Sequence, residues 1–434
     1  MLTKSLSKII PFAVLLIAVY SVQRYAVRPI GNTVIWWPIE ALILFSFFAV
    51  VRYSQMRQED RQAMQAVKWF MLWNVFSIIR GIFVAENYWD YKGLIGMSMG
   101  LLIAVAAYIA LDKERVRAIF AFFIKYALPL AIVLFPLQGS TSWGWYLFPV
   151  SVLMFFLPVL PIRGKIIVII VTIIAGFADL GTRSHVIKYG LPIILLLVFY
   201  SSRHFSLSGK LMKVAQKVLI VMPLIFFTLA ISGIFEIFKL GDYIQGDLVE
   251  TKKSSDGEVV EEDLKMDTRT FLYVEVLQSA KKHNYWLIGR SPARGNDTVA
   301  FADWAEEITG RPERLRNEVG ILNTFTWTGV VGVVLFFLVF YRASFLAVYR
   351  SKNIFLKLIG LFVAFRWAYS WAEDYQGFDM NNFVLWLMIG MCFSSSFREM
   401  NDTQVKLWAW GIFDRSISQR FKKYEQEKLV NSIQ

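Results

Sequence analysis

The sequence contains few of the residue types that make covalent links or metal sites. Its 434 residues include one cysteine, Cys392, and three histidines. A single cysteine excludes an intrachain disulfide and a cysteine-based zinc site. Charge is also scarce: 18% of the residues are charged, 56% are hydrophobic, and the mean hydropathy is +0.48. Soluble domains average about 25% charged residues, so this composition favours a membrane protein.

Basic residues are not concentrated in one polar segment, although the net charge is +13. They flank apolar runs, as residues that set membrane topology do, so we expect no nucleic-acid partner. The first apolar stretch lacks a cleavage site of small residues, because Val22-Gln23-Arg24-Tyr25 follows it. We therefore expect a retained first span rather than a removed signal peptide.

Long apolar runs are abundant, and they predict an all-α polytopic membrane protein with about twelve transmembrane helices. A spanning helix needs roughly 20 mostly apolar residues, with about 17 as the lower limit. The expected limits are 8–27, 34–51, 67–83, 93–111, 116–135, 145–161, 165–181, 188–202, 216–237, 321–341, 353–371 and 382–397.

The distribution of lysine and arginine predicts the orientation. Connections on the side of the N-terminus carry far more of them than the short connections on the other side, which places both termini in the cytoplasm. The chain then divides into helices 1–9 (1–238), one large external loop (239–320), helices 10–12 (321–397) and a cytoplasmic tail (398–434).

The external loop is expected to be a partly helical cap. Lys252 to Asp263 is polar with Asp-Gly at its centre, which predicts an exposed turn or hairpin. Thr270 to Lys281 has helical spacing of its apolar residues, and Phe301 to Thr309 predicts a second short helix. The apolar face expected for the first helix is Phe271, Val274, Leu277 and Ala280.

Ionisable residues within the spans favour one side of the membrane. On the expected topology they lie in the outer halves of helices or in a short outer loop. They are Glu40, Arg80, Asp179 and Arg366 in helices, and Glu373, Asp374 and Asp379 in the loop. Together they predict a polar cavity open to the outside, although each residue alone could be a charge at a helix end.

Arginines are the most informative external residues. Arg183 follows the seventh expected span, and the loop contains Arg269, Arg290, Arg294, Arg311, Arg314 and Arg316. A guanidinium is a fixed fork of donors that stays charged, so several that converge would form a phosphate or pyrophosphate site. Ordinary solvated surface is the alternative for part of this set.

Three short motifs occur in a set order. The first is Thr182-Arg183-Ser184, and the second is Asp267-Thr268-Arg269-Thr270 followed by Leu287-Ile288-Gly289-Arg290-Ser291. The third is Arg316-Asn317-Glu318-Val319-Gly320, which leads to Gly329-Val330-Val331-Gly332. With this topology, the region of roughly 165–345 resembles the O-antigen ligase and polymerase superfamily of bacterial envelope glycosyltransferases. Ligases of that family carry a histidine before the Gly-x-x-Gly helix, and its absence here favours a polymerase-like member.

The resemblance implies an enzyme of O-antigen and lipopolysaccharide biosynthesis in the bacterial inner membrane, with a periplasmic active site. It would transfer a glycan from undecaprenyl pyrophosphate to an acceptor hydroxyl, without a metal or cofactor. The acceptor would be another lipid-linked glycan for a polymerase, or lipid A-core for an O-antigen ligase.

The resemblance also assigns roles to residues. Arg183 and Arg269 would hold the pyrophosphate, with Arg290, Arg314 and Arg316 as further binding residues. Glu318 or Asp267 would accept the proton of the acceptor, and His185 is a further acid–base candidate. The general base, the sugar and its linkage, the stereochemical outcome, the oligomeric state and any chain-length regulator stay open.

Two other functions compete with this one. A transporter or a flippase for lipid-linked oligosaccharides should have two similar halves and polar residues near the bilayer midplane. The long loop breaks such symmetry, and the charges within spans favour one side. A non-enzymatic scaffold of a glycan-assembly complex would not need Arg183 and Arg269 together.

Overall fold

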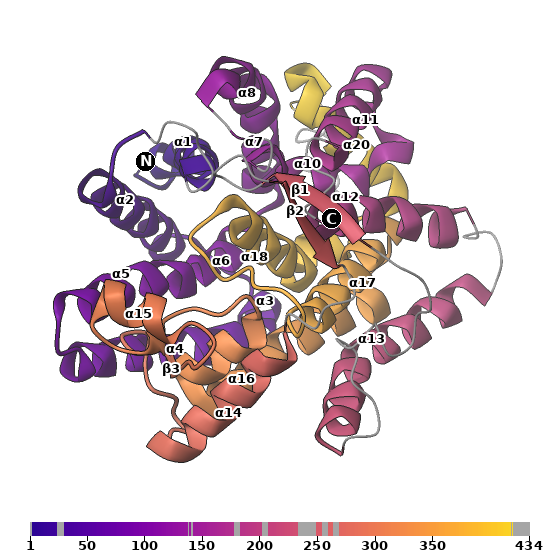
Figure 1. Cartoon of the computed structure of the whole chain (residues 1–434). Helices are drawn as coiled ribbons and strands as arrows, with labels where there is room; N and C mark the ends of the chain where they lie inside the picture. Colours follow the sequence, from indigo (N-terminus) through magenta and orange to yellow (C-terminus); the bar gives the residue numbers. More distant parts are fainter. Residues whose placement is uncertain are drawn as a thin grey trace.

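The computed structural model describes residues 2–23, 30–137, 139, 142–177, 183–201, 207–232, 249–253, 259–263, 269–417 and 419. Helices make up nearly all of the regular structure in these residues, which confirms the helical class (Figure 1). The strands in these ranges form two short antiparallel pairs. They are β1 (Val249–Lys253) with β2 (Val259–Asp263), and β3 (Asn296–Asp297) with β4 (Glu313–Arg314).

The helices fall on both sides of these strands in the sequence. Before them come α1 (Leu2–Gln23), α2 (Thr33–Arg52), α3 (Gln58–Ala63), α4 (Gln65–Val84), α5 (Tyr88–Leu102), α6 (Ala106–Ile109), α7 (Lys113–Phe122), α8 (Leu128–Leu134), α9 (Ser142–Tyr146), α10 (Pro149–Met154), α11 (Ile162–Phe177), α12 (Arg183–Leu195) and α13 (Leu207–Ile231). After β1 and β2 come α14 (Thr270–His283), α15 (Ala302–Thr309), α16 (Gly320–Arg350), α17 (Ile354–Tyr369), α18 (Met380–Phe393), α19 (Ser395–Arg398) and α20 (Asp402–Phe413).

Short polar side chains fix where several helices begin. An Asn or Asp side chain at the N-cap accepts a hydrogen bond from a backbone N–H that the first turn leaves unpaired. The helices with such a cap are α2 (Asn32), α5 (Asn87), α7 (Asp112), α17 (Asn353), α18 (Asp379) and α20 (Asn401).

Within the described ranges, six helical segments are long and apolar enough to cross a membrane. They are Thr33–Arg52, Gln65–Val84, Tyr88–Ile109, Lys113–Leu134, Gly209–Ala230 and Gly320–Arg350. The chain therefore has the helices of a multi-pass membrane protein, while the expected number of twelve spans is not shown.

The expected span 145–161 is not a continuous helix. Its residues form α9, α10 and a 3₁₀ turn (Leu157–Val159), with Pro149 and Pro158 at the starts of the last two. Proline lacks the N–H that would continue a helix, so each one interrupts the helical hydrogen bonding. The segment from Tyr146 to Phe156 is buried inside the protein and not exposed to lipid.

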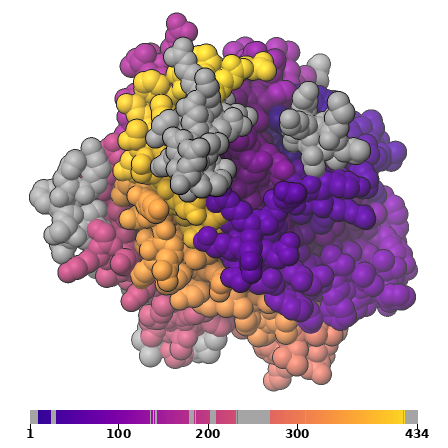
Figure 2. All heavy atoms as spheres, turned by 180° about the vertical axis from the view of Figure 1, so that it is seen from behind, coloured from indigo at the N-terminus to yellow at the C-terminus, as the bar shows by residue number. Residues whose placement is uncertain are grey.

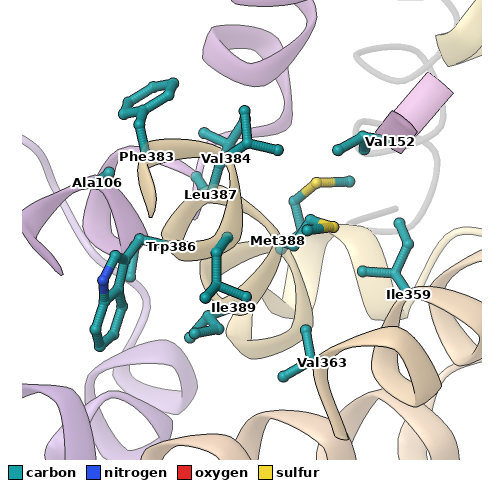
Figure 3. Packing of buried hydrophobic residues seen from close by; sticks show 14 of the residues in the cluster. Ala106, Val152, Ile359, Val363, Phe383, Val384, Trp386, Leu387, Met388 and Ile389 are labelled. Atoms are coloured by element: carbon teal, nitrogen blue, oxygen red, sulfur yellow. The ribbon is translucent and has the colours of Figure 1, made fainter. Parts of the chain in front are cut away.

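The centre of the bundle is α18, in which every residue is buried. Figure 1 shows α6, α16 and α17 around it. Close up, Phe383, Leu387 and Met388 of α18 pack among aliphatic side chains of the neighbouring helices (Figure 3). Seen from behind, the N-terminal helices lie against the segments of the C-terminal third (Figure 2). Helices far apart in sequence thus share one core.

The described part of the expected external loop begins with the β1–β2 hairpin and continues with the two short helices that its sequence predicts. We call residues 269–319 the cap. Helix α14 covers the first predicted helix, but its buried face is Leu272, Glu275, Val276, Ser279 and Ala280. The predicted face was wrong at Val274, which is 46% exposed. Glu275 faces inward because it accepts hydrogen bonds from Thr298 and from the backbone that leads into α15.

Two sequence motifs meet at a break in α16. Gly329 has φ 68° and ψ −172°, so it divides the helix. The freed backbone groups pair with the cap, because Val330 N–H donates to Trp286 O (2.8 Å) and Arg290 N–H donates to Thr326 O (2.6 Å). Gly289, with φ 70°, lies against Gly329. We call this contact the glycine junction.

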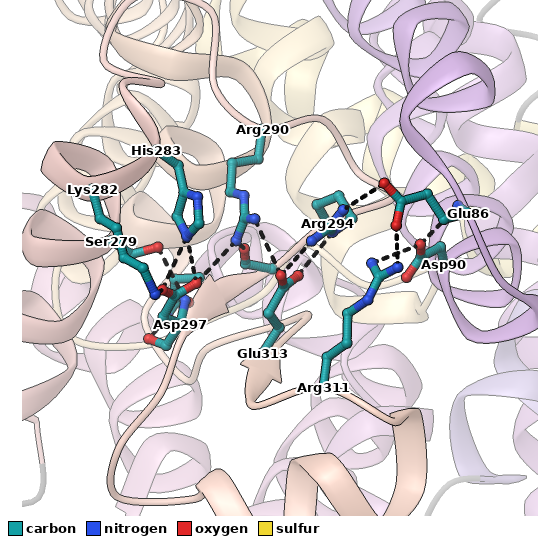
Figure 4. Close-up of polar contacts among 12 residues, drawn as sticks. Glu86, Asp90, Ser279, Lys282, His283, Arg290, Arg294, Asp297, Arg311 and Glu313 are labelled. Atoms are coloured by element: carbon teal, nitrogen blue, oxygen red, sulfur yellow. Dashed lines mark hydrogen bonds and ion pairs between the residues drawn. The ribbon is translucent and has the colours of Figure 1, made fainter.

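A chain of ion pairs joins the cap to the start of α5 (Figure 4). Asp297 accepts from Lys282, His283 and Arg290, and Glu313 accepts from Arg290 and Arg294. Arg294 and Arg311 then contact Glu86, and Arg311 also pairs with Asp90 (3.1 Å). We call this set the charge ladder. It links β3 and β4 to the connection between α4 and α5.

The glycine junction predicts a large effect of Gly329→Ala. A Cβ at Gly329 would lie 2.2 Å from Leu287 O, a backbone atom that cannot rotate away. Its backbone conformation belongs to a region almost restricted to glycine, which alone costs about 1–3 kcal/mol. We expect lower thermal stability in detergent and faster proteolysis of the cap. Gly96→Ala is the control, since no atom lies within 4 Å of the new methyl group, and equal stability of the two variants would contradict the junction.

The charge ladder predicts that acid loosens the cap. Burial raises the pKa of Glu313, but hydrogen bonds from Arg294 and the charges of Arg290, Arg294 and Arg311 outweigh it and hold the pKa below its usual range. Because folding lowers this pKa, the ionised carboxylate stabilises the folded protein at pH values above the ordinary carboxyl pKa. This stabilisation is lost as the pH falls through the lowered pKa of the folded state. Glu313→Gln should remove about 3 kcal/mol at neutral pH.

Hydrogen exchange of the cap at neutral and acidic pH measures this effect. The protection factor of the wild-type cap, which is the exchange rate corrected for the intrinsic effect of pH, should decrease as the pH falls through the carboxyl range. In Glu313→Gln the protection factor should be low at both pH values. Glu306→Gln, at an exposed position of α15, is the matched control. Unchanged protection of the cap in Glu313→Gln would show that the ladder does not hold it.

Candidate functional site

The segment before α16 brings three charged side chains to one cavity. Val319 is fully buried, while Arg314, Arg316 and Glu318 line a cavity at the cap end of the bundle. The third motif of the sequence, together with Arg314 just before it, therefore presents two guanidinium groups and a carboxylate to the same space.

Buried amides hold this segment in place. Asn323 of α16 accepts from Asn317 N–H (2.6 Å) and donates to Asn317 O (2.9 Å). The Asn317 side chain donates to Asn296 in β3 (2.8 Å), and Trp327 Nε1 donates to Leu315 O (3.0 Å). Since these groups are buried, breaking one pair would leave polar atoms unpaired at a cost of about 1–3 kcal/mol. The segment is thereby fixed relative to the glycine junction.

The cavity, which we call the charged cavity, has a volume of about 330 Å³. Its lining comes from four separate parts of the chain, and most of its side chains are charged. They are Trp145, Arg269, Arg314, Arg316, Asn317, Glu318, Glu373 and Asp374. The sequence proposed Arg269, Arg314, Arg316 and Glu318 for one site, and the structure brings these four together.

Arg269 enters the charged cavity at the start of α14, where it occupies the N-cap position. One turn later, the Tyr273 hydroxyl donates to Trp371 O and anchors the helix to the connection between α17 and α18. A helix N-terminus presents unpaired N–H groups and a partial positive charge. Both features at this position favour an anion.

One hydrogen-bond donor of the Arg314 guanidinium is unpaired within the described residues. Its Nε donates to Arg316 O (3.2 Å), and its Nη2 is 3.3 Å from Glu318 Oε1, a carboxylate that is 61% exposed. Its guanidinium lies 4.6 Å from the ring centre of Phe301. Among the residues that the structure describes, its buried Nη1 has no hydrogen-bond partner. An anion in the charged cavity would supply the missing acceptor.

Two carboxylates from the connection between α17 and α18 form the opposite wall. Asp374 pairs with Arg316, and Glu373 accepts from Lys188 (2.9 Å) and from the Tyr369 hydroxyl (3.0 Å). Burial raises the pKa of Glu373, but the charge and hydrogen bonds of Lys188, with bonds from Ser184 and Tyr369, outweigh it and lower the pKa. Glu373 is therefore ionised and fully engaged, which makes it a poor proton acceptor.

The first motif reaches the charged cavity through this carboxylate. Arg183 begins α12, and Ser184 and Lys188 on that helix both contact Glu373. Lys188 also lies 4.9 Å from the ring centre of Trp145, another lining residue. The motif is thus adjacent to the cavity, although the side-chain positions of Arg183 and His185 lie outside the described part of the structure.

Other predicted residues lie elsewhere. Arg290 does not line the charged cavity: it belongs to the charge ladder, where it contacts Asp297, Glu313 and Gly295 O (2.7 Å). Arg294 and Arg311 belong to the same ladder. Asp267 and Asp179 fall outside the described residues.

Sequence reasoning missed two residues of the site. Lys188 is almost fully buried within an apolar helix, and a lysine in such a helix is itself a signal of function. Trp145 is at the start of the expected span 145–161, which predicts no role for it in the site. Its place in the cavity depends on the interrupted helices α9 and α10.

Comparison of the chain with protein-family models and with curated proteins finds no match.

Proposed function

We propose that the chain is a membrane glycosyltransferase. It would transfer a glycan from undecaprenyl pyrophosphate to an acceptor hydroxyl, as a polymerase of O-antigen or a similar surface polysaccharide, at the periplasmic face of the bacterial inner membrane. The observation that carries the proposal is the convergence of Arg269, Arg314 and Arg316 on one cavity. Arg269 belongs to the second sequence motif, Arg316 begins the third and Arg314 lies just before it, so the two parts of the site meet only in the folded chain.

The chemistry of the transfer fits such a cavity. As the bond between the anomeric carbon and the phosphate oxygen breaks, negative charge grows on the pyrophosphate. Donors placed where charge develops lower the barrier, and removing one costs roughly 10²–10³ in rate. Arginine is suited to this work because its planar fork pairs with two phosphate oxygens at once.

The carboxylates of the charged cavity limit where an anion can bind. Asp374 and Glu373 are already paired with Arg316 and Lys188, so they orient the wall rather than repel the ligand as free charges. Arg269 and Arg314 lie on the cap side of the same space. We place the pyrophosphate between these two arginines, where the Arg314 Nη1 donor and the N-terminus of α14 favour it.

Substitution of these arginines tests the proposal. Arg269→Ala and Arg314→Ala should each abolish long surface glycan, because the loss of one guanidinium slows transfer by about 10²–10³. The measurement is the surface glycan of complemented deletion cells on a gel. Both proteins should be made at the wild-type level and fold with the same thermal stability in detergent.

Lys281→Ala is the matched control, since this exposed cation of α14 lies away from the cavity and should leave the glycan unchanged. The deletion strain also separates the two transferases. Core with a single repeat is expected for a polymerase, whereas bare core with long chains on the carrier would identify a ligase. Full-length glycan in both arginine variants would overturn the pyrophosphate site.

A further inference from the structure

A second cavity of about 310 Å³ adjoins the charged cavity. Trp145 and Arg316 line both, so the two spaces share one wall. The other lining residues come from α1, the start of α2 and the end of the connection between α17 and α18. We call it the aromatic cavity because Tyr20, Trp36, Trp37 and Phe378 line it together with Trp145.

The aromatic cavity differs from its neighbour in chemistry. Tyr20 packs against Trp36 and Phe378, with ring centres 5.2 and 5.9 Å apart, which makes a continuous aromatic wall. Apart from Arg316 and Asp379, its polar side chains are uncharged, and they include Asn32 and Thr33 at the start of α2. Aromatic faces with a few neutral donors and acceptors suit a ligand that has apolar faces and a rim of hydroxyl groups. A sugar ring has this character.

One carboxylate of the aromatic cavity lies next to the wall that the two cavities share. Asp379 caps α18 through Oδ1, which accepts from Asn382 N–H (2.9 Å). Its Oδ2 and the Arg316 guanidinium both lie against Gly377, because a Cβ built there would be 2.6 Å from Oδ2 and 3.1 Å from Nη2. The second oxygen of Asp379 is thus beside the guanidinium that belongs to both cavities.

The protonation of Asp379 suits a proton acceptor. The pKa of Asp379 is raised to about 6, because burial, helped by the nearby charge of Asp374, outweighs the opposite effects of Asn382 N–H, Arg316 and Lys188. A base works best when its pKa is near the working pH. The charged and titratable groups that interact electrostatically with Asp379 from the surrounding elements are Tyr20, Lys188, Arg316, Arg366 and Asp374.

We propose that the aromatic cavity binds the terminal sugar of the acceptor glycan, and that Asp379 is the catalytic residue that accepts the proton of its attacking hydroxyl. This inference rests on the proposed glycosyltransferase function. The hydroxyl oxygen forms a bond to the anomeric carbon of the donor, and its proton passes to Asp379. The bond from that carbon to the phosphate oxygen breaks, and the pyrophosphate leaves into the charged cavity with the electron pair.

The arrangement separates the two roles in space. Glu318, the base expected from the sequence, lines only the charged cavity, where the leaving group collects, and its nearest charged partner is Arg314. Asp379 lines only the aromatic cavity, on the side of the acceptor. Arg316 lies between them and contacts both the nucleophile side and the leaving-group side.

The test uses purified full-length protein in detergent, the lipid-linked repeat unit as donor and the free repeat oligosaccharide as acceptor. Asp379→Asn keeps the shape and the N-cap of α18, since asparagine caps helices as well as aspartate. It should lower kcat by about 10²–10⁴-fold. The wild-type rate should fall below pH 6, where Asp379 is protonated, and the variant should lose this limb of the pH profile.

Trp37→Ala tests the binding half of the proposal. Loss of one aromatic face should raise KM for the acceptor by roughly tenfold and leave KM for the donor unchanged. Glu318→Gln is the matched carboxylate control, and its transfer rate should still fall below pH 6 as in the wild type. The inference is overturned if Asp379→Asn keeps the limb, if Glu318→Gln loses it, or if Trp37→Ala alters only the donor KM.

These outcomes are distinct from failure of the proposed function itself. If the wild-type protein transfers the glycan and Arg314→Ala does not, while Asp379→Asn behaves like the wild type, the proposed function is supported and the acceptor site is contradicted. If the wild-type protein transfers no glycan, both proposals are contradicted.

Discussion

The backbone contact between Gly289 and Gly329 is the constraint on which the rest of the structure depends. Both glycines have positive φ, and either Cβ would collide with the backbone of the other segment. The break at Gly329 frees backbone groups that would be costly to leave unpaired inside the protein, and the cap segment supplies their partners. Backbone contacts at the glycine junction therefore fix the cap against α16, and the charge ladder adds side-chain contacts to α5.

The arginines of the cap divide into two groups according to their partners. The paired strands β3 and β4 carry Asp297 and Glu313, and these carboxylates bind Arg290 and Arg294 in the charge ladder. After Glu313, the segment from Arg314 to Glu318 leads from the charge ladder to the charged cavity. Arginines close in sequence thus have different roles. Some fix the cap by pairing with carboxylates, and others line a cavity large enough for a ligand.

The fold class and part of the site could be predicted from the sequence because they depend on local patterns. Helical spacing predicts α14, and its buried face was misassigned because Glu275, a charged residue, is turned inward by backbone donors. Arg290 and Arg314 cannot be distinguished by composition, since both are arginines in one polar loop. Their partners depend on which carboxylates the fold brings near, which is a long-range property.

Asp379 shows the same limit. The sequence places it in an outer loop, and the capping of α18 gives a sufficient structural reason for an aspartate there. Only the folded chain shows that its second oxygen lies beside Arg316, at the wall between two cavities.

The most direct test of the central claim is native mass spectrometry of the purified protein with undecaprenyl pyrophosphate. The wild-type protein should retain this lipid in preference to undecaprenyl monophosphate, because two phosphates engage more guanidinium donors than one. The Arg269→Ala/Arg314→Ala double variant should lose the preference while keeping its other bound lipids. Equal retention of the pyrophosphate lipid by wild type and double variant would contradict the account.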